Sequence, residues 1–318
     1  MLYVTLIMGV IWSAVAVSWG QNVPGYVQSR YVLPPHVVKQ GCTFAGSKVP
    51  LNQKEAMLRV QEQVNLLLMD RRFQTMDTLD RLVVYGPTLR AVLEDEKIPE
   101  DLVYFAAILS GLVPTITARN GGIGIWAIPG NKRNQGSGYT ATSDWDDRKD
   151  PVISTRLAAT ILKGLLRTNY QNDWFLALSA YVDGTEAVDR VVNKAPGFSF
   201  WDLVMPPSSE VLIPRVVALK VIDTHKEFYG ISVVPLAHLT YEYLDRIKLE
   251  KDLPLHVVAH WCGVNPRLVW ELNPGVDPLS GILPKADKTF PQGLPLRVPQ
   301  GMRQKVTHLL AKEGYVSN

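Results

Sequence analysis

The sequence has little of what several classes of protein require. It contains 2 cysteines among 318 residues, too few for a disulfide-stapled fold or a four-cysteine zinc site. Its 33 Lys and Arg nearly balance its 30 Asp and Glu, so it lacks the basic excess with which nucleic-acid-binding proteins neutralise phosphates. The run Gly121-Gly122-Ile123-Gly124 lacks the last glycine of a dinucleotide fingerprint, and the chain has no phosphate-binding loop motif. These absences argue against nucleic acid and nucleotide binding.

What the chain does contain is enough apolar material for ordinary folded domains. Hydrophobic residues make up 47% and charged residues 20% of the sequence, a balance typical of globular proteins. A length of 318 residues predicts two domains, since domains run to roughly 100–200 residues each. Composition therefore predicts a globular two-domain protein, and the function has to come from motifs.

The N-terminal segment is a long hydrophobic run. Residues 2–19 carry no charged side chain, which predicts either a secretory signal or a membrane anchor, because about 18 apolar residues can span a bilayer. Small residues at Ala16 and Ser18, and again at Ser18 and Gly20, fit a signal cleavage site, although no basic residue precedes the run. We expect residues 1–21 to be a signal peptide or anchor of an exported protein, and membrane contact to occur only there.

Proline and hydrophobic spacing divide the next part of the chain. Four prolines predict an irregular segment over residues 22–50. From 51 to 231, apolar residues recur at three- and four-residue spacing, which predicts a mainly helical domain. The expected helices cover residues 72–84, 87–96, 102–109, 152–167 and 173–193.

The pattern changes after Gly230. Residues 252–275 predict two short helices joined at Gly263-Val264-Asn265-Pro266, and Gly293 to Pro299 predict a short extended segment. We therefore expect a small second module over residues 232–302, followed by a C-terminal tail over 303–318.

A series of short motifs in the helical part carries a resemblance. The landmarks are, in order, Ile98-Pro99-Glu100-Asp101-Leu102, Ser110 with Pro114, Gly124-Ile125-Trp126, Ile128-Pro129-Gly130, Asp150-Pro151, Ser154-Thr155-Arg156, Asp173-Trp174-Phe175, Ala180-Tyr181, Gly184, Phe200-Trp201, Pro214 and Tyr229-Gly230-Ile231. The ordered set resembles the catalytic domain of membrane-bound lytic transglycosylases of the D type. Residues 237–300 resemble the small module that these proteins carry before their LysM repeats. The resemblance implies a mainly α fold, in which a lysozyme-like helical domain is followed by a small α+β module, in the periplasm or cell envelope of a Gram-negative-type bacterium.

The departures from this family fall on its polar groups. The resemblance places the family's catalytic glutamate at Leu109, its groove glutamine at Ala127 and a groove asparagine at Val182. The glutamate and tyrosine of a later family motif fall at Ser208 and Leu212. Residues that shape the fold are kept, whereas five groups that would contact the sugar or act as the acid are gone.

These departures decide the candidate site. Cleavage of a glycosidic bond needs a carboxyl group that protonates the leaving oxygen, and Leu109 cannot do this. Asp183 is the candidate for a relocated acid, and a turn or helix-capping role is the alternative for it. Trp126 and Tyr181 could still stack on a sugar ring, and the alternative for both is that they are core residues that pin the glycine-rich loop to the helices. The residues expected to line the groove are Ser110, Trp126, Ala127, Tyr181 and Val182.

Other residue clusters have simpler interpretations. The four aspartates between residues 144 and 150 lack the spacing of a calcium loop and are expected in caps and salt links. His256 and His260 lack the glutamate of a metalloprotease helix, so we expect neither a metal nor a cofactor. Cys42 and Cys262 could pair in an oxidising compartment or remain free thiols.

Two functions follow from these residues. The first is a catalytically inactive protein that binds peptidoglycan glycan strands, or a partner protein, as an envelope scaffold. The alternative is an active lytic transglycosylase that cleaves the MurNAc-GlcNAc bond with Asp183 as a relocated acid.

Overall fold

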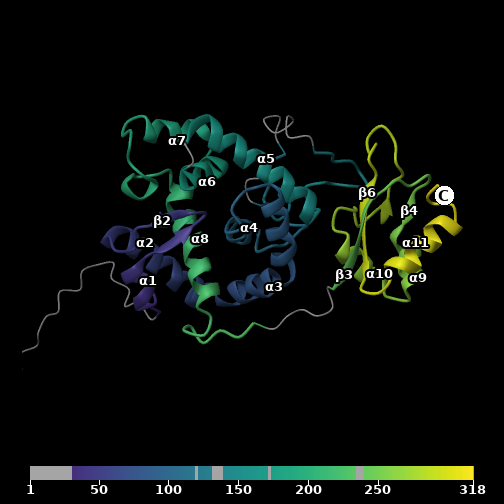
Figure 1. Ribbon diagram of the computed structural model, residues 1–318, viewed down its shortest axis with the longest axis horizontal. Helices are drawn as coiled ribbons and strands as arrows, with labels where there is room; N and C mark the ends of the chain where they lie inside the picture. The colour runs from purple at the N-terminus through teal and green to yellow at the C-terminus, as the bar shows by residue number, and fades with distance from the viewer. Residues whose placement is uncertain (1–30, 119–120, 131–138, 171–172, 234–239, 318) are drawn as a thin grey trace, which may run out of the picture.

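The computed structural model describes residues 31–118, 121–130, 139–170, 173–233 and 240–317. It is mainly α-helical, as expected, with a larger helical part and a smaller part that holds the longer strands (Figure 1). The expected signal or anchor over residues 1–21 lies outside the described residues. Within the described ranges, no helix combines the length and hydropathy needed to cross a membrane.

The helical part runs from residue 31 to residue 233. Its elements are α1 (Pro35–Gln40), β1 (Cys42–Phe44), β2 (Ser47–Val49), α2 (Lys54–Asn65), the π-helix η1 (Leu66–Asp70), α3 (Arg72–Asp95), α4 (Leu102–Ser110), α5 (Pro151–Asn169), α6 (Trp174–Asp183), α7 (Thr185–Val192), the 3₁₀-helix η3 (Phe200–Asp202) and α8 (Pro207–Thr224).

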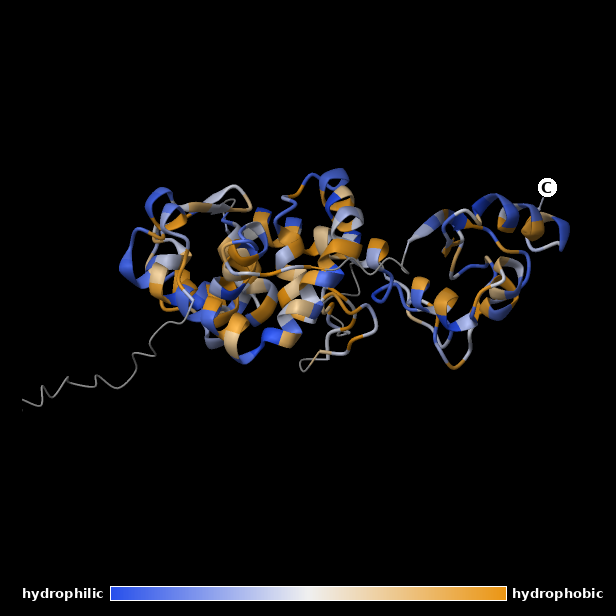
Figure 2. Ribbon diagram, turned by 90° about the horizontal axis from the view of Figure 1, so that it is seen from below, coloured by the Kyte–Doolittle hydropathy of each residue, from blue (hydrophilic) through white to orange (hydrophobic). Residues whose placement is uncertain are grey.

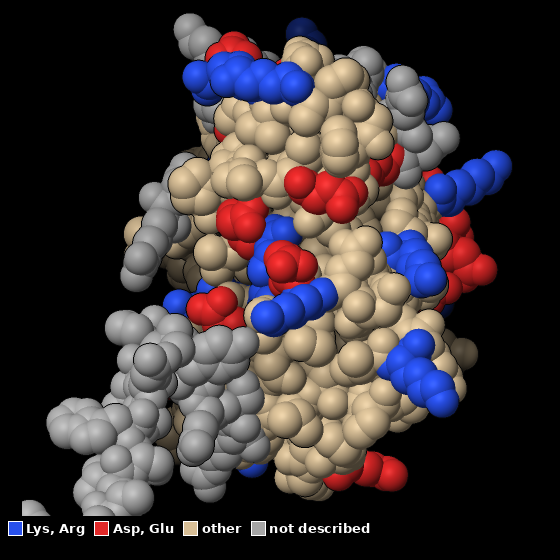
Figure 3. Space-filling view, turned by 90° about the vertical axis from the view of Figure 1, so that its left-hand side faces the viewer, with Lys and Arg blue, Asp and Glu red and all other residues tan. Residues whose placement is uncertain are grey.

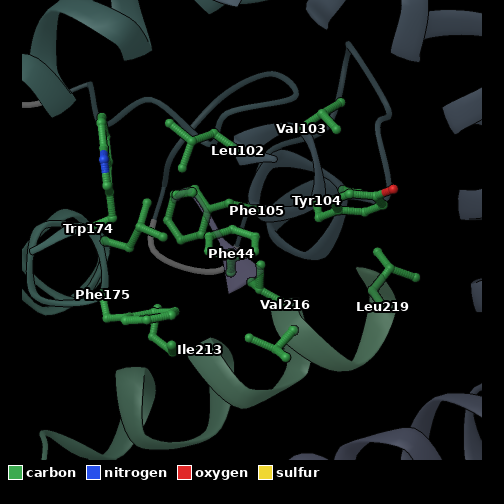
Figure 4. Packing of buried hydrophobic residues seen from close by; sticks show 14 of the residues in the cluster. Phe44, Leu102, Val103, Tyr104, Phe105, Trp174, Phe175, Ile213, Val216 and Leu219 are labelled. Atoms are coloured by element: carbon green, nitrogen blue, oxygen red, sulfur yellow. The ribbon is translucent and has the colours of Figure 1, made fainter. Parts of the chain in front are cut away.

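Helix α4 lies in the middle of this part and is buried on nearly every side. Its sequence, LVYFAAILS, is apolar around its whole circumference, which is typical of a helix enclosed by others. Phe105 packs with side chains from β1, α6 and α8, and these point toward one another (Figure 4). Hydrophobic segments accordingly gather in the middle of the helical part, while hydrophilic ones lie mostly at its edges (Figure 2). The helix that ends at the candidate site is therefore rigidly held.

Three expectations about local structure were wrong. Residues 31–50 form α1 and the antiparallel hairpin β1–β2, because Ala45 and Gly46 both adopt positive φ angles of 50° and 77°, as a two-residue hairpin turn requires. The helices expected at 72–84 and 87–96 are one helix, α3, which continues through Pro87. The helix expected at 173–193 is divided at Gly184, whose φ of 85° ends α6.

The smaller part has its own hydrophobic core. Its elements are β3 (Tyr241–Ile247), β4 (Leu253–Pro254), α9 (Leu255–Cys262), α10 (Pro266–Leu272), β5 (Ile282–Leu283), β6 (Leu294–Pro299) and α11 (Arg303–Lys312). Strands β3 and β6 pair antiparallel, with Leu244 opposite Leu296. The expected pair of short helices is present as α9 and α10. The expected tail is helix α11, whose Val306 and Leu310 are buried in this core.

The loop before α5 joins the two parts. Trp145 is 1% exposed and packs in the core of the smaller part, although it precedes that part by about 100 residues of sequence. Its ring lies so close to Gly275 that an added Cβ there would come within 2.6 Å of it. Backbone bonds from Asp146 N to Gly275 O (2.8 Å) and from Asp277 N to Asp144 O (2.8 Å) extend the contact.

Candidate functional site

Three hydrogen bonds bring four segments of the helical part to one place. The Ser110 hydroxyl at the end of α4 donates to Ile125 O at 2.7 Å. The Tyr181 hydroxyl on α6 donates to Trp126 O at 2.8 Å. The backbone N–H of Ser209, in the first turn of α8, donates to Asp183 Oδ2 at 2.9 Å. The end of α4, the 125–127 loop, the end of α6 and the start of α8 are therefore held together.

Four apolar residues adjoin these bonds, and we call them the apolar corner: Leu109, Ala127, Val182 and Leu212. The first three each neighbour a bonded residue in the chain, and Leu212 lies one helical turn beyond Ser209. Leu109, Val182 and Leu212 are half-buried against the main core, and Ala127 is buried. Four of the five positions at which the family resemblance implies polar groups therefore carry only hydrocarbon, and the fifth carries the exposed Ser208.

Ser110 has a structural explanation that is complete without a ligand. Its buried hydroxyl donates toward Ile125 O and Ala106 O and accepts from Leu112 N at 3.0 Å. A hydroxyl has one proton and two acceptor sites, so these contacts use most of its capacity. Ser110 fastens the end of α4 to the 125–127 loop.

Trp126 does not offer a stacking surface, which corrects the expectation for this residue. It is 0% exposed, and its indole N–H donates to the Thr155 hydroxyl at 2.8 Å. The sequence pattern, a glycine-rich loop before an aromatic residue, does not distinguish a groove residue from a core residue that pins the loop. Here the ring is core.

Tyr181 is also held in the fold, although part of it reaches the surface. Its ring packs edge-on against Phe105 at 5.5 Å between centroids, and burial raises the pKa of its phenol above the ordinary value. With its hydroxyl bound to Trp126 O, its polar group is already used.

The 122–127 loop approaches its neighbours so closely that side chains are excluded. A Cβ at Gly124 would lie 1.8 Å from Arg148 O, and one at Gly122 would lie 2.1 Å from Ala127 O. Ala127 itself has φ of 47°, a left-handed conformation that costs a non-glycine residue of order 1–3 kcal/mol. The loop is therefore kept in its shape by close packing, even though the polar side chain expected at residue 127 is missing.

The carboxylates of Asp183 and Glu210 have partners within the fold. Asp183 is the last residue of α6 and accepts from Ser209 N in the first turn of α8, so it caps a helix far away in sequence and not the local helix start at Gly184 that the sequence suggested. Glu210 accepts from Met205 N at 2.9 Å and pairs with Arg59 at 3.0 Å. The Arg59 guanidinium lies over the rings of Phe200 and Trp201. Both carboxylates are therefore already occupied by hydrogen bonds or an ion pair within the fold.

Three of the four aspartates between residues 144 and 150 bind the backbone or an arginine, whereas Asp144 accepts from the Ser143 hydroxyl at 3.2 Å. Asp146 pairs with Arg148 at 2.8 Å, Asp147 accepts from Thr140 N at 2.7 Å, and Asp150 caps α5. Across the described ranges, no three His, Cys, Asp or Glu side chains are grouped to hold a metal ion. His256 and His260 are exposed on α9.

Two further observations bear on the sequence expectations. Cys42 and Cys262 are free thiols in the structure, each packed with a different core. On the face at the α1–α2 end, acidic and basic side chains are interspersed (Figure 3). That face has no continuous basic stripe of the kind that binds nucleic acid.

The described helices and the glycine-rich loop that follows α4 agree with the mainly helical domain expected over residues 51–231. Residues 89–204 match the family described as the transglycosylase SLT domain, so this part of the chain is similar to that family.

Two curated relatives extend the similarity. The chain is 28% identical over 223 residues to membrane-bound lytic murein transglycosylase D of Escherichia coli strain K12, covering 69% of this chain and 48% of that protein. The protein of the same name from E. coli O6:H1 strain CFT073 matches with the same values. The chain thus spans about half the length of the curated relatives it matches.

Proposed function

We propose that this protein is a catalytically inactive member of the lytic transglycosylase family that acts in the cell envelope as a binding scaffold. The observation that supports this most strongly is the apolar corner. At the end of α4, where the family resemblance places the acid, the side chain is Leu109, and it packs against the core. General acid–base catalysis contributes about 10²–10⁴ to the rate, and a leucine contributes none of it.

The surroundings of Leu109 favour the same proposal. Ala127, Val182 and Leu212 offer no hydrogen bond that could orient a sugar, and orientation contributes several kcal/mol to the barrier reduction in its own right. A substitution of the acid alone would leave a polar groove behind. Replacement of four of the five family groups by hydrocarbon, and of the fifth by Ser208, is the pattern expected of a fold that is kept without turnover.

The alternative of an active enzyme depends on Asp183. Its carboxylate accepts a hydrogen bond from Ser209 N, and moving it toward a substrate would uncap α8. Capping is worth about 1 kcal/mol, which adds to the cost of recruiting this residue. We therefore place the relocated acid second.

Peptidoglycan is the proposed partner. We expect the binding to be weak, because Trp126 and Tyr181 pack inside the fold and do not form a surface on which sugar rings could stack. A purified sample incubated with insoluble peptidoglycan should release no anhydro-muropeptides by chromatography with mass detection. The E. coli relative provides the positive control. Release that is abolished in Asp183→Asn would establish the active alternative. If the protein does not sediment with peptidoglycan, the proposed ligand is wrong and a protein partner takes its place.

A further inference from the structure

A cavity of about 380 Å³ lies where η1, α3, the end of α4 and α8 meet. Helices α3, α4 and α8 all belong to the helical part (Figure 1). Its volume falls within the range of about 300–1,000 Å³ typical of small-molecule sites. One side is apolar, with Leu67, Ile108 and Leu219 among its lining residues. It borders the end of α4, where Ile108, Ser110 and Gly111 are part of its lining and Leu109 is not.

The polar side of this cavity carries three arginines from three elements. Arg71 follows the π-helix η1, Arg81 lies on α3 and Arg215 on α8. The acidic residue in the lining is Asp77, whose carboxylate is exposed and lies 4.0 Å from Arg81 Nη2. The lining therefore carries three positive charges and one negative charge.

Two of the arginines are anchored by their neighbours. Arg215 Nε donates to Gln63 Oε1 at 2.9 Å, and Arg81 Nη1 donates to Gly111 O at 3.1 Å. Among the residues that the structure describes, no carboxylate forms an ion pair with Arg71 or Arg215. The planar guanidinium group has several donors in a fixed fork, so donors of Arg215 remain after its bond to Gln63.

The electrostatics of Arg215 point the same way. Burial lowers the pKa of its guanidinium, and the positive charge of Arg71 lowers it further. Two like charges that share a partly desolvated cavity repel each other, and an anion placed between them would offset that repulsion.

We propose that this cavity binds a small oxyanion ligand that carries about two negative charges, held between Arg71, Arg81 and Arg215. The arginine forks match carboxylate and phosphate oxygens, and the net lining charge matches a dianion. Because the cavity has an apolar side, the ligand has a hydrocarbon part as well. Two kinds of ligand carry such oxyanion groups: a peptide or muropeptide with free carboxylates, and a phosphorylated metabolite.

This site is separate from the apolar corner and does not depend on the proposed function. Calorimetric titration of the purified full chain with inorganic phosphate, and separately with a muropeptide monomer that carries free carboxylates, tests it. Arg71→Gln and Arg215→Gln should each weaken binding by about tenfold or more, while Arg215→Lys retains part of it. Arg303→Gln is the matched control, since it removes one positive charge from the exposed start of α11.

The results distinguish the sources and can overturn the proposal. Tighter binding of phosphate identifies a phosphorylated ligand, and tighter binding of the muropeptide identifies a peptide carboxylate. Arg71 is exposed, so its variant reports on binding without a folding defect. No binding of either probe at millimolar concentration would overturn the proposal. The proposal would also be overturned if Arg303→Gln weakened binding as much as the cavity variants do, or if Arg71→Gln and Arg215→Gln both left binding unchanged.

Discussion

Asp150 and Arg297 form a buried ion pair across 147 residues of sequence, with Oδ2 to Nη1 at 2.5 Å and Oδ1 to Nη2 at 3.0 Å. Asp150 is 0% exposed and Arg297 2% exposed. The same carboxylate caps α5 through Val152 N and Ile153 N. The Asn273 side chain binds the backbone of Arg297 twice: its Nδ2 donates to Arg297 O, and its Oδ1 accepts from Arg297 N. The start of α5 and strand β6 are thus joined by one network.

Removal of one member of this pair should destabilise the whole protein. Arg297→Met keeps most of the side-chain volume but leaves the Asp150 carboxylate buried without its cation, which costs about 3–5 kcal/mol. Chemical denaturation would measure this loss. Arg267→Met breaks the exposed pair of Arg267 with Glu271 and should give little measurable change. A similar small effect for both variants would contradict the role assigned to the buried pair.

A second prediction concerns Trp126. Trp126→Phe removes the hydrogen bond to Thr155 and should cost about 1–2 kcal/mol, whereas Trp126→Ala leaves a cavity and should cost about 3–5 kcal/mol. Denaturation of both variants checks the stability values. Co-sedimentation of the Phe variant with peptidoglycan should equal that of the wild type. A stable Phe variant that no longer co-sediments would show that the ring contacts glycan after all.

The sequence predicted the helical architecture because its apolar spacing is regular, and the family resemblance placed Leu109 at the end of α4. It did not predict that α3 continues through Pro87, because a proline inside a helix removes a backbone hydrogen bond. In the structure, burial of Leu82 and Leu89 on either side outweighs that loss. Nor did it predict that Trp126 is core, because a local pattern does not say which elements will cover a ring. The arginine cavity was missed because Arg215 is far in sequence from Arg71 and Arg81, and only the folded chain brings the three together.

Restoring the family acid should not restore activity. Leu109→Glu places a carboxylate on a half-buried site without a partner, so we expect a loss of about 1–3 kcal/mol in stability and no release of anhydro-muropeptides. The rest of the apolar corner would still leave the sugar unoriented. Leu109→Gln has nearly the same shape without the charge and serves as the control. A folded, active Leu109→Glu variant would show that the groove is intact.

The thiol of Cys42 should react slowly. Burial raises its pKa from 9.0 to about 11, against the opposing effect of Lys220. At pH 8 this two-unit rise lowers the thiolate fraction about 100-fold relative to an unfolded chain. The rate of alkylation in a Cys262→Ser variant, with and without urea, measures the difference. Equal rates in both conditions would contradict the burial of this thiol.

The stability of the protein should depend on pH through Asp173. Burial raises the pKa of this carboxyl above its ordinary value, even though bonds from Phe175 N and Leu176 N oppose the rise. The folded state therefore holds the proton more tightly than the unfolded chain. This contribution to stability is present below the ordinary pKa and is lost as pH rises through the folded value.

Asp173→Asn tests this directly, because asparagine can still cap α6 and does not titrate. The variant should gain stability relative to the wild type as pH rises from about 3.5 to 7, measured by denaturant titration at each pH. A relative gain by the wild type over the same range would mean that the capping bonds outweigh burial.

Trp145 limits how independently the smaller part can exist. Its indole fills the core beside Gly275, yet it belongs to the loop that precedes α5. A fragment that begins after α8 would fold around a hole the size of an indole ring, and the remaining fragment would expose that ring to water. The smaller folding module is therefore not built from one contiguous stretch of sequence. A recombination event that transplanted this module would have to carry residues 139–150 with it, or repack the gap that they leave.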